Sequence, residues 1–279
     1  MNWKFRKTLR EIFLVALLSL GALITITPLI YMIATALKGP VYVFEIPPRL
    51  IPEQPTLQNF ISAWTSNQFS RYFLNSIFVT VVSVVAILLL ASMMAYAFAR
   101  HSFMGKKILY ALVIFFMTLP AMSLIVPQFI LARDLALTDK LGGLIAMDIA
   151  QNLPFATFLL RGFLEEIPKE IEEAAYMDGA SAWSIYWFIV LPLCKPALAT
   201  SAIFAFLGAW DEYVWASTII NTPKLRTLPV GIAVFQGVHT TNWGLVFAAS
   251  LIAIVPVLIL FASLQKYFIK GMVAGAVKG

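Results

Sequence analysis

The chain has 279 residues, of which 61% are hydrophobic and only 12% are charged. Soluble domains carry roughly 25% charged residues, so this composition excludes an ordinary soluble protein and indicates an integral membrane protein. The formal net charge of +6 does not indicate nucleic-acid binding, because the basic residues gather at the ends of apolar runs. The single Cys194 excludes an internal disulfide, and with only His101 and His239, both expected in loops, a metal site is not predicted.

Continuous apolar runs predict transmembrane helices rather than a β-barrel, whose strands would alternate. We expect an all-α integral membrane protein with a single transmembrane domain over residues 1–279. The basic N-terminus leads into an apolar run without a small-residue cleavage site, which indicates a retained first helix. The six predicted spans are residues 12–37, 71–99, 108–132, 141–163, 193–219 and 243–267.

A polar segment at residues 38–70 follows the first predicted span. It contains Pro40, Pro47, Pro48, Pro52 and Pro55, and so many prolines predict a loop without a regular element. Four further prolines fall inside predicted spans, where we expect kinks rather than backbone carbonyls opened to a cavity. They are Pro120, Pro127, Pro154 and Pro256.

Six spans place both termini on one side of the membrane. In that arrangement, the side of the membrane that holds the termini carries thirteen lysines and arginines, and the opposite side carries seven. The positive-inside rule therefore predicts cytoplasmic termini and an external loop at residues 38–70. It also places the segment between spans four and five, residues 165–192, in the cytoplasm.

That cytoplasmic segment is an acid-rich island in an apolar chain, with six of the fourteen acidic residues. Lys169 to Met177 has no helix breaker, and Ile171, Ala174 and Ala175 share one face of the helix predicted there. Gly179 is suited to end that helix in the left-handed conformation. Ser181 is expected to cap a second helix that stops at Pro192. We predict two short helices with a small-residue face that fits a groove on another protein.

The spacing within this island resembles the EAA loop of ABC importer permeases. The similar residues are Glu173-Ala174-Ala175, then Gly179, then Ile189 to Pro192. The resemblance implies a coupling helix that docks into a cleft on a cytoplasmic ATPase. The residues expected to take part are Glu173, Ala174, Ala175, Asp178, Gly179, Leu191 and Pro192. An ordinary helical hairpin between two spans is the alternative.

Nearly the whole chain resembles the carbohydrate-uptake, maltose-type branch of these permeases. The similar stretches include Pro55-Thr56-Leu57, Asn75-Ser76, Ala95-Tyr96-Ala97 with Arg100, Ala209 to Tyr213, and the tail from Gln265 to Gly279. The resemblance implies a bacterial-type inner-membrane subunit that imports a sugar or related polyhydroxylated solute by alternating access. Its expected partners are a second homologous permease, two copies of a cytoplasmic ATPase and an extracytoplasmic solute-binding protein.

The chain lacks the Walker A sequence G-x-x-x-x-G-K-[ST]. We therefore expect a non-catalytic transport subunit without a bound cofactor, with ATP and Mg²⁺ on the partner ATPase. An ATP-independent secondary carrier or channel is the alternative, although no internal repeat or charge relay is evident. A membrane enzyme is disfavoured by the absence of H-E-x-x-H and G-x-S-x-G. A structural membrane scaffold is a third possibility.

Two polar groups inside predicted spans are candidates for the solute pathway, because buried polar groups in membranes are costly. Carboxylates and amides suit sugar hydroxyls, and aromatic faces suit the sugar ring. The candidates are Asp148, Gln151 and Asn152 in span four, and Trp210, Asp211, Glu212 and Tyr213 in span five. The alternatives are that the first group joins neighbouring helices and that the second anchors its helix at the outer interface.

Overall fold

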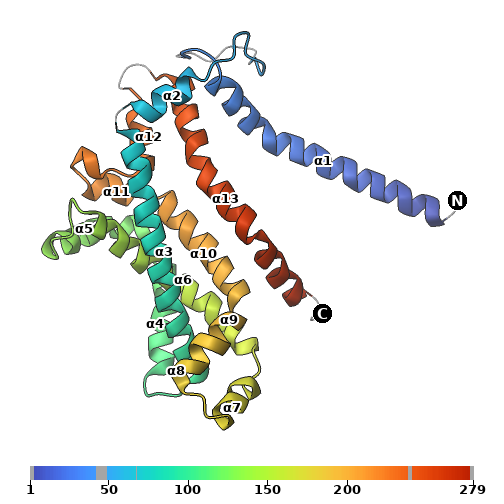
Figure 1. Cartoon of the computed structure of the whole chain (residues 1–279), viewed down its shortest axis with the longest axis vertical. Helices are drawn as coiled ribbons and strands as arrows, with labels where there is room; N and C mark the ends of the chain where they lie inside the picture. Colours follow the sequence, from blue (N-terminus) through green and yellow to red (C-terminus); the bar gives the residue numbers. More distant parts are fainter. Residues whose placement is uncertain (1–2, 42–48, 67, 238–240, 277–279) are drawn as a thin grey trace. The chain divides into compact units, whose positions relative to one another are not determined.

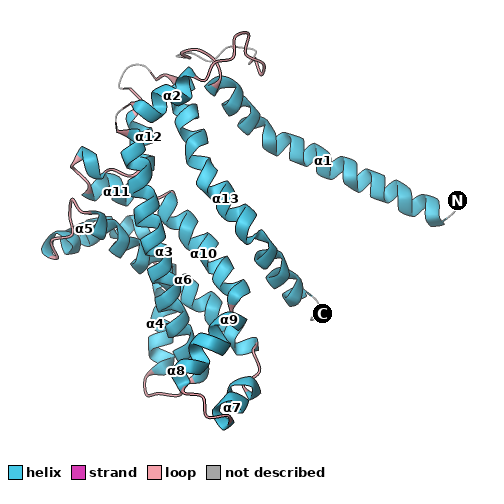
Figure 2. Cartoon of the chain, in the orientation of Figure 1, coloured by secondary structure: helices cyan, strands magenta, loops and turns pink. Residues whose placement is uncertain are grey.

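The computed structural model describes residues 3–41, 49–66, 68–237 and 241–276. The expectations for Pro47, Pro48, His239 and Val277 to Gly279 lie outside these ranges. The described residues form helices, turns and loops, without a β-strand among them (Figure 2). His101 lies in the turn that follows a long helix, as predicted. The fold is therefore all-α, as the continuous apolar runs predicted.

The helical elements follow one another along the chain, and Figure 1 labels the α-helices among them. They are α1 (Trp3–Ala36), α2 (Gln58–Thr65), α3 (Phe69–Arg100), α4 (Lys106–Thr118), η1 (Ala121–Leu124), α5 (Ile125–Asp134), α6 (Leu141–Glu166), α7 (Glu170–Met177), α8 (Ala182–Ile185), the π-helical turn η2 (Tyr186–Val190), α9 (Leu191–Leu193), α10 (Lys195–Trp210), α11 (Val214–Ile219), η3 (Pro223–Leu225), α12 (Leu228–Val234) and α13 (Trp243–Ala276).

Four helices are long and apolar enough to cross a membrane: Arg10–Ala36 of α1, all of α3, all of α6, and Trp243–Lys266 of α13. Two further pairs pass the same test but are bent. Lys106–Thr118 meets Ala121–Asp134 at 98°, and Ala182–Leu193 meets Lys195–Ile219 at 75°. The described residues therefore hold four candidate spans, or up to six if each bent pair is one span.

The chain divides into two compact units, residues 1–69 with 232–254, and residues 70–231 with 255–279. In the first unit, the amide of Asn59 on α2 donates hydrogen bonds to the carbonyls of Ala36 (3.0 Å) and Lys38 (2.6 Å). Asn59 thereby satisfies carbonyls at the C-terminal end of α1, which lack helical partners. The prediction that residues 38–70 hold no regular element is wrong here, because the stretch after Pro55 has no proline and forms α2.

Small side chains fill much of the core of the second unit. Ala91 and Ala95 of α3, Ala156 of α6, and Ala197 and Ala205 of α10 belong to one buried cluster. Small residues allow membrane helices to approach closely, because no long side chain holds the two backbones apart. A Cβ added at Gly208 of α10 would lie 2.6 Å from Oδ1 of Asn152 on α6. The backbone of α10 at Gly208 therefore packs closely against the Asn152 side chain of α6.

Proline breaks one predicted span but not another. The third predicted span, 108–132, is interrupted at Leu119 and Pro120, both of which have extended backbone. The α-helical conformation is disfavoured for a residue that precedes proline. This explains why the predicted span is fully broken at Leu119, where only a kink was expected. Pro127 lies in the first turn of α5, where its missing N–H costs little. Pro154 and Pro256 lie inside α6 and α13.

The second helix of the 165–192 segment does not stop at Pro192, contrary to the prediction. It passes through η2 into α9, which contains Pro192, and α10 begins at Lys195. In η2 the N–H of Leu191 bonds to the carbonyl of Tyr186, five residues earlier. The wider turn before Pro192 relieves the clash that a proline ring makes with the preceding helical turn, so the helix continues.

Candidate functional site

The segment 165–192 folds locally much as its sequence predicted. Helix α7 covers Glu170–Met177 and is followed by Gly179 with a φ of +84°. Only glycine adopts this left-handed conformation readily, so Gly179 ends the helix as expected. The hydroxyl of Ser181 accepts a hydrogen bond from the N–H of Ser184 (3.2 Å) and caps α8. Two short helices joined by a glycine turn are thus confirmed.

Helix α7 turns apolar side chains outward. Ile171 and Ala174 are exposed and Ala175 is half-buried, while Met177 is 88% exposed. The predicted contact residue Glu173 is exposed on the same helix, and Asp178 is exposed just after it. Leu191 and Pro192 lie in α9, at the far end of the segment. Ile171 and Ala174 are therefore exposed, as a docking surface requires, whereas Ala175 packs against the buried core cluster.

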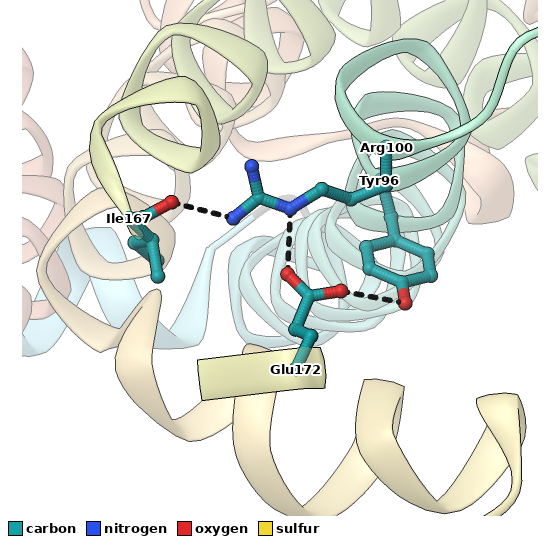
Figure 3. A network of polar contacts seen from close by, with 4 residues as sticks. All are labelled: Tyr96, Arg100, Ile167 and Glu172. Atoms are coloured by element: carbon teal, nitrogen blue, oxygen red, sulfur yellow. Dashed lines mark hydrogen bonds and ion pairs between the residues drawn. The ribbon is translucent and has the colours of Figure 1, made fainter. Parts of the chain in front are cut away.

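Glu172 is the one buried residue of α7, and the sequence reasoning did not single it out. Its carboxylate accepts hydrogen bonds from the Tyr96 hydroxyl (3.0 Å) and from Nε of Arg100 (2.5 Å), both on α3. Nη2 of Arg100 also donates to the carbonyl of Ile167, the residue that follows α6 (2.8 Å). Figure 3 shows the guanidinium between these two acceptors. A clue in the sequence was the resemblance at Ala95-Tyr96-Ala97 with Arg100.

A second polar cluster lies at the opposite end of α3. Arg71 and Asn75 donate hydrogen bonds to the carbonyl of Lys224 at 3.1 and 3.0 Å. Asp139 accepts hydrogen bonds from Thr222 (N–H 2.8 Å, hydroxyl 2.6 Å) and from the N–H of Asn221. The Thr222 hydroxyl, followed by these N–H groups, holds the pKa of Asp139 below its ordinary value. Helix α3, about 48 Å long at 1.5 Å per residue, therefore separates this cluster from α7.

The second unit contains a cavity of about 770 Å³ between α4, η1, α5 and α6. Its walls are mostly apolar side chains. The amides of Gln128 on α5 and Gln151 on α6 are the polar side chains of its wall apart from the Trp215 indole. An apolar pocket with a few polar groups is the ordinary form of a small-molecule site.

The candidate residues of α6 divide between this cavity and the helix interfaces. Gln151 lines the cavity. Asp148 is 4% exposed and accepts a hydrogen bond from the Ser83 hydroxyl of α3 (3.0 Å). Asn152 donates to the backbone carbonyl of Asp148 and lies against Gly208. Of the three, only Gln151 faces open space.

The candidate residues from Trp210 to Tyr213 do not form one cluster. Trp210 is buried and packs against Phe73 (ring centroids 5.9 Å apart) and Phe206 (5.5 Å). The Glu212 carboxylate accepts hydrogen bonds from the N–H groups of Trp215 (2.6 Å) and Ala216 (2.7 Å), and so caps α11. Asp211 and Tyr213 are exposed. Glu212 lies two residues before α11 begins at Val214, and the usual N-cap residues, serine, threonine, asparagine or aspartate, do not mark this capping role in the sequence.

Apolar helices long enough to cross a membrane, a cavity between several of them and a short amphipathic helix with exposed apolar side chains are together typical of the membrane-embedded subunit of a transporter. The chain belongs to the family described as binding-protein-dependent transport system inner membrane component, which matches residues 87–273. It is accordingly a permease subunit of an ABC transporter and a multi-pass protein of the inner membrane.

Two curated relatives support this assignment over most of their length. A putative ABC transporter permease protein, ORF2 of a Caldicellulosiruptor species, is 37% identical over 94% of this chain and 95% of its own. The sulfoquinovosyl glycerol transport system permease protein SmoH of Agrobacterium fabrum is 35% identical over 90% of this chain and 88% of its own.

A solved structure has the same fold. It belongs to a bacterial ABC transporter involved in the import of the acidic polysaccharide alginate, with a TM-score of 0.81. Its sequence is 26% identical, and the alignment covers 96% of this chain and 99% of that one. The arrangement of helices is therefore that of an ABC transporter permease.

Proposed function

We propose that this permease subunit imports a sugar or a related polyhydroxylated solute. The similar proteins named above transport a sulfoquinovosyl glycerol and a polysaccharide, both of which are rich in hydroxyl groups. The amides of Gln128 and Gln151 in the cavity wall suit such hydroxyls, since an amide both donates and accepts hydrogen bonds. This chain forms half of the pathway, and a second homologous permease forms the other half.

In this proposal each bent helix pair is one span, so that six spans leave both termini in the cytoplasm. The basic side chains at the C-terminal end of α3 and the start of α4, such as Arg100 and Lys106, then lie on the cytoplasmic side. The cluster around Asp139 and Thr222 lies outside. The extracytoplasmic solute-binding protein delivers the solute to that side.

The observation that carries the mechanism is the uncovered face of α7. Exposed Ile171, Ala174 and Met177 offer an apolar surface to a protein partner, because apolar groups outside the membrane gain by leaving water. The partner is a cytoplasmic ATPase, present in two copies, which binds ATP and Mg²⁺; this chain binds neither. ATP binding closes the ATPase pair, and α7 moves as a lever that turns the cavity from inward-open to outward-open.

The test is a reconstituted transporter with variants of the docking face. Bulky residues at Glu173 and Ala175, or a β-branched residue at Gly179, are expected to uncouple ATP hydrolysis from uptake. Glu11→Gln, which changes an exposed glutamate of α1, serves as the control. Normal uptake by the docking-face variants at normal assembly levels would contradict the proposal, as would uptake by this chain alone without ATP.

The solute pathway has a separate test. Gln151→Ala is expected to raise the KM for uptake at normal protein levels, because Gln151 lines the cavity. Asp148→Ala is expected instead to lower the amount of folded protein, since its partner Ser83 is buried. The reverse pattern would place the pathway on the other face of α6.

A further inference from the structure

Three side chains of α3 form hydrogen bonds with two helical parts of the 165–192 segment, one with η2 and two with α7. Ser92, Tyr96 and Arg100 follow one another at four-residue intervals, so they lie on one face of α3. We call them the α3 stripe. The Ser92 and Tyr186 hydroxyls share a hydrogen bond of 2.8 Å, which joins α3 to η2. Tyr96 and Arg100 bind Glu172, which joins the same face to α7.

The contact with α7 is buried and directional. The side chains of Arg100 and Glu172 are 6% and 8% exposed. Arg100 lies in the last turn of α3 and binds the carbonyl of Ile167 just after α6, where helix dipoles favour a positive charge. Glu172 lies in the first turn of α7, where they favour a negative one. The planar guanidinium satisfies both acceptors at once, which a lysine could not do in the same geometry.

The chain itself does not connect α3 to this segment. Residues 165–192 continue directly from α6 and lead directly into α10, so both of those helices follow the segment through the backbone. Helix α3 is held to it by side-chain contacts alone. Apolar packing is non-directional, whereas a buried charged pair fixes one geometry and is costly to leave unmatched.

We propose that the α3 stripe is the contact through which the 165–192 segment moves α3, with Arg100 and Glu172 as positioning residues. The inference rests on the proposed coupling of this segment to an ATPase. Movement of α3 changes the cavity in two ways. Met94 of α3 lines the cavity directly, and Ser83 of α3 bonds to Asp148 of α6, the helix whose Gln151 also lines the cavity. Without the stripe, α6 and α10 still follow the ATPase and α3 lags behind.

The functional test uses the complete transporter in proteoliposomes, with its partner chains and binding protein. Glu172→Gln and Arg100→Lys are expected to raise the number of ATP molecules hydrolysed per solute imported by roughly three- to thirtyfold. Tyr96→Phe, which removes one neutral hydrogen bond, is expected to have a smaller effect in the same direction. Glu11→Gln, at an exposed glutamate of α1, is the control. A ratio in Glu172→Gln and Arg100→Lys equal to that of the control overturns the inference.

Copurification of the ATPase separates this inference from the proposed function. The ATPase is expected to remain bound to the Glu172→Gln variant, because Glu172 is buried within this chain. Failure of the unaltered chain to bind an ATPase would overturn the proposed function and the inference with it. Binding by both chains with an unchanged hydrolysis ratio would overturn the inference alone.

A distance measurement tests the same contact without relying on activity. Spin labels attached to Met104→Cys and Met177→Cys report the position of α7 relative to α3. Met104 is fully exposed in the turn after α3, and Met177 is 88% exposed at the end of α7. The labels require Cys194→Ala, which removes the native thiol. We expect a narrow distance distribution in this background and a broader one after Glu172→Gln or Arg100→Lys. An unchanged width in both would overturn the inference.

Discussion

Asp139 holds Thr222, 83 positions later in the chain, through both of its carboxylate oxygens. Oδ1 accepts the Thr222 N–H and Oδ2 accepts the Thr222 hydroxyl. Asp139 itself has a φ of +54°, so its backbone is in a conformation that few side chains tolerate. The pair joins the turn before α6 to the loop after α11.

The Asp139 contact makes a prediction about pH. Its pKa is lowered in the folded protein, chiefly by the Thr222 hydroxyl, so the carboxylate form stabilises the fold. This stability is complete above the ordinary carboxyl pKa of about 4 and is lost as the pH falls through the lower folded value. We expect Asp139→Asn, which keeps the backbone conformation accessible, to lower the unfolding temperature at neutral pH.

Thermal unfolding of the purified protein at several pH values checks this. The difference between the unaltered chain and Asp139→Asn should stay constant down to about pH 5 and shrink below about pH 4. A difference that persists unchanged at the lowest pH would show that the carboxylate charge contributes nothing.

The contact between Gly208 and Asn152 predicts a sensitive helix interface. Gly208→Ala is expected to destabilise the protein by about 1–3 kcal/mol, because its Cβ would lie 2.6 Å from the Asn152 side chain. Asn152→Ala shortens that side chain, so the double variant should recover part of the loss. Unfolding measurements on the four proteins of this cycle give the coupling, and additive losses would argue against the contact.

Asn59 makes a prediction for the first unit. It is 5% exposed and its amide binds the carbonyls of Ala36 and Lys38. Asn59→Ala leaves these carbonyls without that donor and should cost about 1–3 kcal/mol. Hydrogen exchange at the end of α1 should rise in step. Gln58→Ala, a change at an exposed neighbour, is the matched control and should leave both measurements near their original values.

Gly179 allows backbone strain to be separated from crowding. A Cβ at this position would meet no atom within 4 Å, so within this chain a substitution costs only the left-handed conformation. That cost is roughly 1–2 kcal/mol for most residues and less for asparagine. We expect the smallest loss of uptake for Gly179→Asn, a larger loss for Gly179→Ala and the largest loss for Gly179→Val. Equal loss for asparagine and alanine would point to contact with the ATPase in place of strain.

Much of the fold and part of the site were predictable because their signals are local. Continuous apolar runs predicted the helices, and the positions of Gly179 and Ser181 predicted the turn and cap of the 165–192 segment. The errors came from prolines. Pro192 was expected to end a helix, but the π-helical turn before it allows the helix to continue, and no periodicity in the sequence marks such a turn.

The sequence by itself determined that this chain is a helical membrane protein with an amphipathic helical segment between two apolar runs, because composition and periodicity act over short distances. Only the tertiary structure decided which polar residues share a site. Gln151 faces a cavity while Asp148, three residues earlier, faces α3, since the neighbours of a helix set what each face meets. The bond between Arg100 and Glu172, 72 positions apart, likewise depends on helix packing that no local pattern encodes.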